Sequence, residues 1–290
     1  MNYPLWLFGI SALVALFEYM WPAREQPFIR SSLWSDIVYL IFNGHFLGMF
    51  LYGIASYHVL PHFDLYLQEN GIHHLVYYQA VQNWGWSIVT QSIAVLVIKD
   101  FIEWIIHNAL HRLPFFWNFH KIHHSVKDGE MSWIVAFRFS WLEVVTYKSL
   151  TYLPLIWFGF ATEALIVPII LSTLIGHLNH SNLAWDYGWG KYIINSPRMH
   201  LYHHDYHAPP TGQNFGIVFS CWDWIFGTAR LPKTPPQRIG YPQEHELPND
   251  FLGQLIWPLP MVIQKLKNLP HTNRFLGLAL LFILYMFSLP

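Results

Sequence analysis

The sequence places ten histidines in four groups with helical spacing, and these groups limit the folds that the chain can adopt. Residues three or four apart lie on the same face of a helix, so each group can present its rings together. Imidazole is the commonest protein ligand for transition metals, and one mononuclear site takes three or four protein ligands. We therefore predict two metal ions where distant parts of the chain meet. The ten candidate ligands are His107, His111, His120, His123, His124, His177, His180, His200, His203 and His204.

Two runs of the form HxxHH, at residues 120–124 and 200–204, are hard to obtain by chance, and we interpret them as metal-binding. For the other histidines we expect structural or solvated roles, including His207, four residues after His203. The single Cys221 excludes an intrachain disulfide and a cysteine-based zinc or iron–sulfur site. The histidines outside the ten candidates and His207 are His45, His58, His62, His73, His74, His245 and His271.

The composition is that of a membrane protein. Hydrophobic residues make up 53 % of the 290-residue chain and charged residues only 11 %, whereas soluble domains carry about 25 % charged residues. The 15 Trp, 16 Tyr and 22 Phe suit a chain whose rings lie at the boundary between lipid and water. The net charge of −1 provides no basic field, so we expect no nucleic-acid partner. We predict an all-α, multi-pass integral membrane helical bundle.

Apolar segments divide the chain, and a bilayer span takes about 20 such residues. The first ends in Trp21-Pro22 and lacks the basic start and cleavage site of a signal peptide, so we interpret it as an anchor helix. The expected spans are 5–20, 34–60, 84–106, a hairpin over 141–178 that turns near 158–162, and a short span at 275–289. We accordingly divide the chain into N-terminal transmembrane helices at 1–94, a histidine-rich domain that includes the hairpin at 95–230, and a C-terminal tail at 231–290.

The distribution of Lys and Arg predicts the orientation, because cytoplasmic loops carry an excess of both. Arg24 and Arg30 place the first loop in the cytoplasm, and the segment 61–83, which has neither Lys nor Arg, lies outside as a loop. The third span then delivers His107 to the cytoplasmic side, and the hairpin returns His177 to the same side. All four histidine groups are thus expected in a helical cap at the cytoplasmic face. The charges that agree with this orientation are Arg112, Lys121, Lys127 and Arg138.

A site made almost entirely of imidazoles suits iron and could also bind zinc or copper. A hydrolytic zinc site would use three protein ligands, a water and a carboxylate base, and does not need ten histidines. Two irons that are each held by four or five imidazoles can reduce and cleave O₂, and the resulting oxidant can attack an unactivated C–H bond. Carboxylates should orient the ligating rings. The candidates for that role are Asp100, Glu103, Glu143, Asp205 and Asp223.

A series of short motifs follows in order through the middle of the chain. They are Asp100-Phe101, the run from His107 to Arg112, Trp117, the run from His120 to Ser125, Arg138 with Glu143, His180-Ser181-Asn182, Pro197, His200 with His203-His204, Asn214-Phe215-Gly216 and the run from Trp222 to Thr228. In combination they resemble the fatty acid hydroxylase / sterol desaturase superfamily over about residues 95–230. Two positions depart from its pattern: Asn108 stands where many members have Arg, and Ser140 where many have a histidine. The alkylglycerol monooxygenase branch is similar in lacking that histidine.

The resemblance implies an O₂-dependent, non-haem di-iron enzyme of the membrane, with the named histidines as iron ligands. The favoured hypothesis is a lipid hydroxylase that inserts one oxygen atom into a C–H bond of a sterol, fatty acyl, ether or other lipid. A desaturase using the same oxidant is the nearest alternative, and a histidine-rich metal transporter or a non-catalytic scaffold is a more distant one. The chain has no motif for its own redox cofactor, so an external reductase, ferredoxin or cytochrome b5-like donor is implied.

Overall fold

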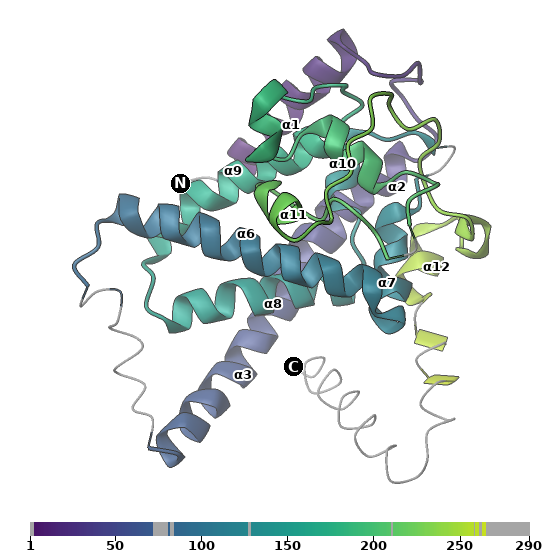
Figure 1. Cartoon of the computed structure of the whole chain (residues 1–290). Coiled ribbons are helices and arrows are strands. Elements are labelled where there is room, and N and C mark those ends of the chain that lie inside the picture. Colours follow the sequence, from purple (N-terminus) through teal and green to yellow (C-terminus); the bar gives the residue numbers. More distant parts are fainter. Residues whose placement is uncertain are drawn as a thin grey trace.

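The structure is a computed structural model that describes residues 3–71, 81, 84–126, 129–209, 211–257, 259–260 and 263–264. Its regular structure is helical, and the described residues contain isolated β-bridges but no strand (Figure 1). The prediction of an all-α chain is therefore confirmed for this part of the protein. The predicted span at 275–289 and the pair His73-His74 lie outside the described residues.

The first apolar segment forms helix α1 (Tyr3–Met20), which packs against helix α9 (Thr162–His180). Glu18 is buried near the end of α1, and its carboxylate accepts hydrogen bonds from the backbone N–H groups of Trp133 (3.0 Å) and Asn182 (3.2 Å). A buried carboxylate needs such donors to offset its lost hydration. These bonds tie α1 to the segment at Trp133 and to the segment that follows α9.

The second apolar segment is longer and less regular than predicted. It forms α2 (Leu33–Val38), the π-helix η1 (Tyr39–Leu47) and α3 (Gly48–Glu69). The predicted loop at 61–83 is wrong in its first part, because α3 continues through Pro61 to its end. Proline has a fixed φ close to that of a helix, so Pro61 can stay in α3 at the cost of one hydrogen bond.

Helix α6 (Ile88–Arg112) packs against both α9 and α8 (Trp141–Trp157) and lies between them (Figure 1). α8 begins with a capping box, in which the side chains of Ser140 and Glu143 each accept a hydrogen bond from the other residue's backbone N–H. α8 and α9 form the predicted hairpin, and its turn occupies residues 158–161.

The histidine-bearing helices meet at one end of this layer. α6 continues past its predicted end at residue 106, α7 (Pro114–His124) follows it directly, and α10 (Pro197–His203) packs against α9. Pro114 and Pro197 lie in the first turn of their helices, where a missing N–H costs no helical hydrogen bond. The shorter elements are η3 (Trp133–Phe137), η4 (Gly188–Tyr192), α11 (Cys221–Ile225), η5 (Glu244–Glu246) and α12 (Phe251–Ile256).

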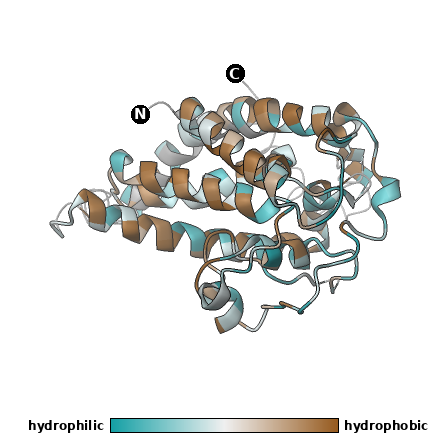
Figure 2. Ribbon diagram, turned by 90° about the horizontal axis from the view of Figure 1, so that it is seen from above, coloured by the Kyte–Doolittle hydropathy of each residue, from teal (hydrophilic) through white to brown (hydrophobic). Residues whose placement is uncertain are grey.

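Hydrophobic residues make up much of the long helices (Figure 2), and many of them are exposed. Phe8 on α1 is 74 % exposed and Val89 on α6 is 69 % exposed. Among the described helices, α9 is the one that is long and apolar enough to cross a bilayer, and residues 4–20 form a shorter apolar helix.

Candidate metal centre

The structure brings nine of the ten predicted histidines together in two buried groups. In each group, every residue offers one ring nitrogen, and these nitrogens all lie within 4.8 Å of one another. The helices α6, α7, α9 and α10 supply them, with His204 directly after α10. The five-histidine group consists of His107, His111, His120, His124 and His203, and the four-histidine group of His123, His180, His200 and His204.

Each HxxHH run serves both groups. His120 and His124 belong to the five-histidine group, whereas His123 between them belongs to the four-histidine group. The run after Pro197 is divided in the opposite sense, because His203 joins the five-histidine group while its neighbours in the run join the other. At 3.6 residues per turn, positions i and i+4 point about 40° apart and position i+3 points about 100° away from i+4. The middle histidine of each run can therefore reach the other group when the neighbouring helices place one group on each side of it.

Hydrogen bonds orient several rings and determine which nitrogen is free. Where Nδ1 lies against a backbone carbonyl it must carry the proton, because a carbonyl only accepts, and Nε2 of the neutral ring then keeps its lone pair. These pairs are His107 Nδ1 with Phe215 O (2.8 Å), His203 Nδ1 with Gln213 O (2.7 Å) and His180 Nδ1 with Gly176 O (2.7 Å). Nδ1 of His120 lies 2.6 Å from Oε1 of Glu143 and carries the proton when that carboxylate is ionised.

Several free nitrogens face one another at short distances. Nε2 of His107 lies 3.2 Å from Nε2 of His120, and Nε2 of His180 lies 2.9 Å from Nε2 of His200 and 3.0 Å from Nε2 of His123. For His107 and His120 both nitrogens present lone pairs, which repel each other unless a cation lies between them. Other ring nitrogens are buried without a hydrogen-bond partner among the described residues, namely Nε2 of His111, His124 and His203, Nδ1 of His123 and His200, and both nitrogens of His204. This donor set fits metal ions.

A proton is a poor substitute for a metal ion here. Burial lowers the pKa of His124, His203 and His204 well below the usual value, because it disfavours the charged imidazolium, and neighbouring histidines lower it further. The rings are therefore neutral near pH 7, which is the form that binds metals.

One of the predicted carboxylates orients a ring directly. Glu143 is completely buried, and through its bond to His120 it connects α8 with the five-histidine group. Glu103 instead bonds the Lys99 amine at 2.6 Å, and Asp205 accepts from the backbone N–H of His207 at 3.1 Å. Neither of these two contacts a ligating ring.

Asp100 and Asp223 support the site indirectly, through the backbone of the loop before α11. Asp223 accepts hydrogen bonds from the N–H groups of Phe215 (2.9 Å) and Gly216 (2.8 Å), and so positions the carbonyl that holds His107. Asp100 accepts from the N–H of Val218 (2.7 Å) and from two further donors on Phe219 and Trp222. Asp100 thus anchors the loop before α11 to helix α6, and Asp223 anchors the same loop to α11.

His177 lies outside both groups. Its Nε2 lies 3.1 Å from Oγ of Ser11 on α1, and its Nδ1 lies 3.1 Å from the carbonyl oxygen of Trp133. The residue is one turn earlier in α9 than His180, and this turn faces α1 and η3 rather than α7 and α10. His207 is exposed and also stands outside both groups, as expected.

Sequence reasoning missed the backbone groups of the loop that covers the five-histidine group. The carbonyls of Gln213 and Phe215 hold two ligating rings. Gly212 approaches so closely that a Cβ there would lie 2.8 Å from the ring of His111, and its φ of +72° also favours glycine. The Asn214-Phe215-Gly216 motif marked this loop, but a backbone carbonyl has no signature in a sequence.

Comparison with known proteins places this centre within a recognised domain. Residues 92–228 match the fatty acid hydroxylase family. Ornithine lipid hydroxylase OlsE of Rhizobium tropici is 29 % identical over 174 residues, which cover 60 % of this chain and 51 % of that protein. The alkylglycerol monooxygenases of Caenorhabditis elegans and Xenopus tropicalis are 27 % and 25 % identical over 53 % and 50 % of this chain, and 29 % and 30 % of their own lengths. The matched part of the chain spans about half of the length of ornithine lipid hydroxylase and less than a third of the lengths of the two monooxygenases. No solved structure matches it.

Proposed function

Residues 92–228 of this chain form a fatty acid hydroxylase domain, and from that premise we propose that the protein is an O₂-dependent, non-haem di-iron lipid hydroxylase. In this reaction a C–H bond and O₂, with two electrons and two protons, give a C–OH group and water. The substrate we propose is a lipid of the membrane in which the enzyme resides. Ornithine lipid hydroxylase and alkylglycerol monooxygenase are similar to this chain, and their names favour hydroxylation over desaturation.

The observation that carries the proposal is the convergence of nine buried imidazoles in two adjacent groups. A single hydrolytic zinc ion would need three protein ligands and an open position. Two groups with five and four nitrogen donors suit two ions of a redox-active metal, and iron accepts imidazole readily. Two iron ions bound there would supply the activation of O₂ and the attack on the C–H bond.

The residues of this chain orient the ligands and exclude water. Three backbone carbonyls and the Glu143 carboxylate hold one nitrogen of four rings, so the other nitrogen of each ring points into the site. Such partners fix the tautomer and raise the basicity of a ligating histidine. All nine rings are buried, which keeps bulk water from the reacting groups and limits side reactions.

Exposed apolar helices support a location in the membrane. The outward side chains of α1 and α6 form apolar surfaces of a kind that monomeric soluble proteins rarely expose, and α9 is long and apolar enough to span. We propose a multi-pass protein with the metal centre at the cytoplasmic ends of its helices. A lipid tail can then enter from the bilayer, while an external reductase, ferredoxin or cytochrome b5-like protein delivers electrons from the cytoplasm.

The transporter alternative fits the histidine positions less well. Transporters bind ions near the middle of the membrane on interrupted helices that open to each side in turn. Here the histidines lie in the last turns of α6, α7 and α9 and in and directly after the short α10, and they are buried. This arrangement favours a fixed, resident metal pair over a transported ion.

The proposal is tested by metal analysis and lipid analysis of the same variants. We expect two iron ions per chain in the replete protein, and a hydroxylated lipid in membranes that contain it. His203→Ala should abolish the lipid product while the protein remains in the membrane, because it removes one ligand of the five-histidine group. His207→Ala is the matched control, since that exposed histidine lies outside both groups. Full turnover by His203→Ala, or one metal ion per replete chain, would contradict the proposal.

A further inference from the structure

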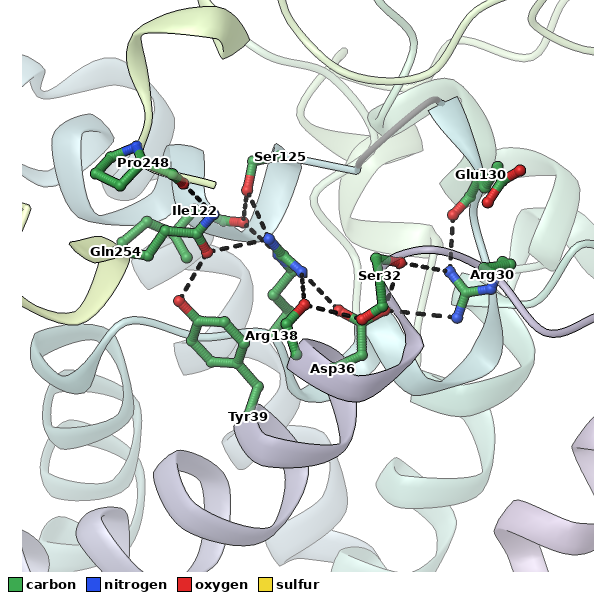
Figure 3. A network of polar contacts seen from close by, with 11 residues as sticks. Arg30, Ser32, Asp36, Tyr39, Ile122, Ser125, Glu130, Arg138, Pro248 and Gln254 are labelled. Carbon is green, nitrogen blue, oxygen red and sulfur yellow. Dashed lines mark hydrogen bonds and ion pairs between the residues drawn. The ribbon is translucent and has the colours of Figure 1, made fainter. Parts of the chain in front are cut away.

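A buried polar network joins three distant parts of the chain directly behind the end of α7 (Figure 3). At its centre, the Arg138 guanidinium donates to Oδ1 of Asp36 on α2 (2.6 Å) and to Oε1 of Gln254 on α12 (3.0 Å). All three residues are buried. Asp36 and Gln254 lie outside the segment 92–228 that matches the family.

The same guanidinium contacts the residues on both sides of His123 and His124, one through its backbone and the other through its side chain. Its Nε donates to the carbonyl oxygen of Ile122 (3.2 Å), and its second NH₂ group donates to the hydroxyl of Ser125 (3.3 Å). The last carbonyls of a helix have no partner within the helix, so its final turn frays unless other donors bind them. The carbonyl oxygen of Ile122 accepts from the backbone N–H (3.2 Å) and the hydroxyl (2.6 Å) of Ser125, and Arg138 is a further donor to it from another part of the chain. The planar fork of Arg138 fixes direction as well as position.

Further contacts fix the two residues that hold Arg138. The second carboxylate oxygen of Asp36 accepts from the Ser32 hydroxyl at 2.9 Å and lies 3.5 Å from the Arg30 guanidinium, as Figure 3 shows. Gln254 also accepts from the Tyr39 hydroxyl at 2.9 Å, and the Tyr39 ring lies below the guanidinium of Arg138. Arg138 is therefore held by groups that cannot easily move.

From these contacts we infer that Asp36 and Gln254, acting through Arg138, are positioning residues for His123 and His124. The two histidines are neighbours in sequence but belong to different groups. One clamp on the residues that flank them therefore sets the positions of a histidine in each group. The inference rests on the proposed metal centre, and it extends the catalytic unit beyond the matched domain to helices α2 and α12.

The test compares cobalt binding by the full chain, purified in detergent, with and without the charge of Asp36. Asp36→Asn keeps the size of the side chain but removes the charge that holds Arg138. We expect Co²⁺ to bind about tenfold more weakly, in line with the effect of losing groups that orient metal ligands. We also expect the visible absorption bands of bound Co²⁺ to change, because they report ligand geometry.

The matched control is Glu103→Gln, which breaks another buried ion pair, with Lys99, by the same change from carboxylate to amide. Thermal unfolding should reveal a loss of stability in both variants. A purely structural role predicts that Asp36→Asn, like the control, leaves cobalt affinity and spectrum unchanged, and that result would overturn the inference.

If Asp36→Asn does not fold, the milder variant Gln254→Ala tests the same inference. Gln254→Ala removes one acceptor from Arg138 and should shift the cobalt spectrum in the same direction, by less. An unchanged spectrum in this variant would also overturn the inference. Wild-type protein that binds fewer than two Co²⁺ ions would refute the metal centre itself. Two ions in the wild type, with an unaltered spectrum in the variants, would refute the clamp alone.

Discussion

Glu143→Gln should weaken metal binding at the five-histidine group about tenfold. The carboxylate lies 2.6 Å from Nδ1 of His120, and both side chains are at most 1 % exposed. A hydrogen bond to a charged group contributes roughly 1.5–3 kcal/mol, against roughly 0.5–1.5 kcal/mol for a neutral pair. The difference of about 1.4 kcal/mol corresponds to about a factor of 10 in the dissociation constant. Metal ions close by also favour the ionised carboxylate in the wild type.

Glu143→Gln also affects the cap of α8, and this effect must be separated from the effect on metal binding. Glu143 has two acceptor oxygens, of which one faces His120 and the other accepts from the N–H of Ser140 in the capping box. Glutamine has one such oxygen, so Glu143→Gln weakens either the ring contact or the cap. Ser140→Ala weakens the cap without touching His120 and should cost about 1 kcal/mol of stability.

Competition titration with a chromophoric chelator would measure the dissociation constants of both variants, and chemical unfolding their stabilities. We expect Glu143→Gln to lose affinity and Ser140→Ala to lose stability with unchanged affinity. If Glu143→Gln bound metal as tightly as the wild type, the carboxylate would have no orienting role. If Ser140→Ala lost as much affinity as Glu143→Gln, the effect would belong to the start of α8 and not to the contact with His120.

Three further predictions concern metal retention, pH dependence and orientation. His123→Ala leaves three nitrogens in its group whereas His124→Ala leaves four, so His123→Ala should lose more metal than His124→Ala by elemental analysis after dialysis. Burial lowers the pKa of His203 and His204, so the unfolded chain binds more protons below pH about 6.5. The unfolding free energy of the metal-free protein should therefore fall as pH decreases below that value; a flat profile in denaturant titrations would contradict this. Protease added to right-side-out vesicles should spare residues 181–258, and cleavage there would reverse the proposed orientation.

The sequence identifies the histidines of the centre because three- and four-residue spacing places rings on one side of a helix, whatever the tertiary structure. It does not reveal that each HxxHH run is divided between two groups, because that division depends on how the helices meet. The case of His177 shows the limit of this reasoning. It has the same type and spacing as its neighbours, but the surface of α9 that it occupies packs on α1, and its ring bonds Ser11. Which side of a helix meets which neighbour is a tertiary property.

The predicted orientation depends on cations that the structure uses for other purposes. The positive-inside rule counts Lys and Arg in short loops on the assumption that they are solvated. Arg30 and Arg138 are instead buried beside Asp36, and Lys121 is buried with its amine 5.0 Å from the centre of the Trp257 ring. Charge counting cannot separate such cations from exposed ones like Arg112. The cytoplasmic location of the centre therefore stays a prediction, which the protease experiment tests directly.

The division of each HxxHH run between the two groups has a consequence for how the centre works. α7 sends two histidines to the five-histidine group and one to the other, and the run on α10 does the reverse. The rings of His124 and His204 lie 4.3 Å apart between centres, although they belong to different groups. Neither helix can shift without moving histidines of both groups, so the two groups form one structural unit. Contacts that hold the end of α7, such as those of Arg138, therefore act on both groups at once.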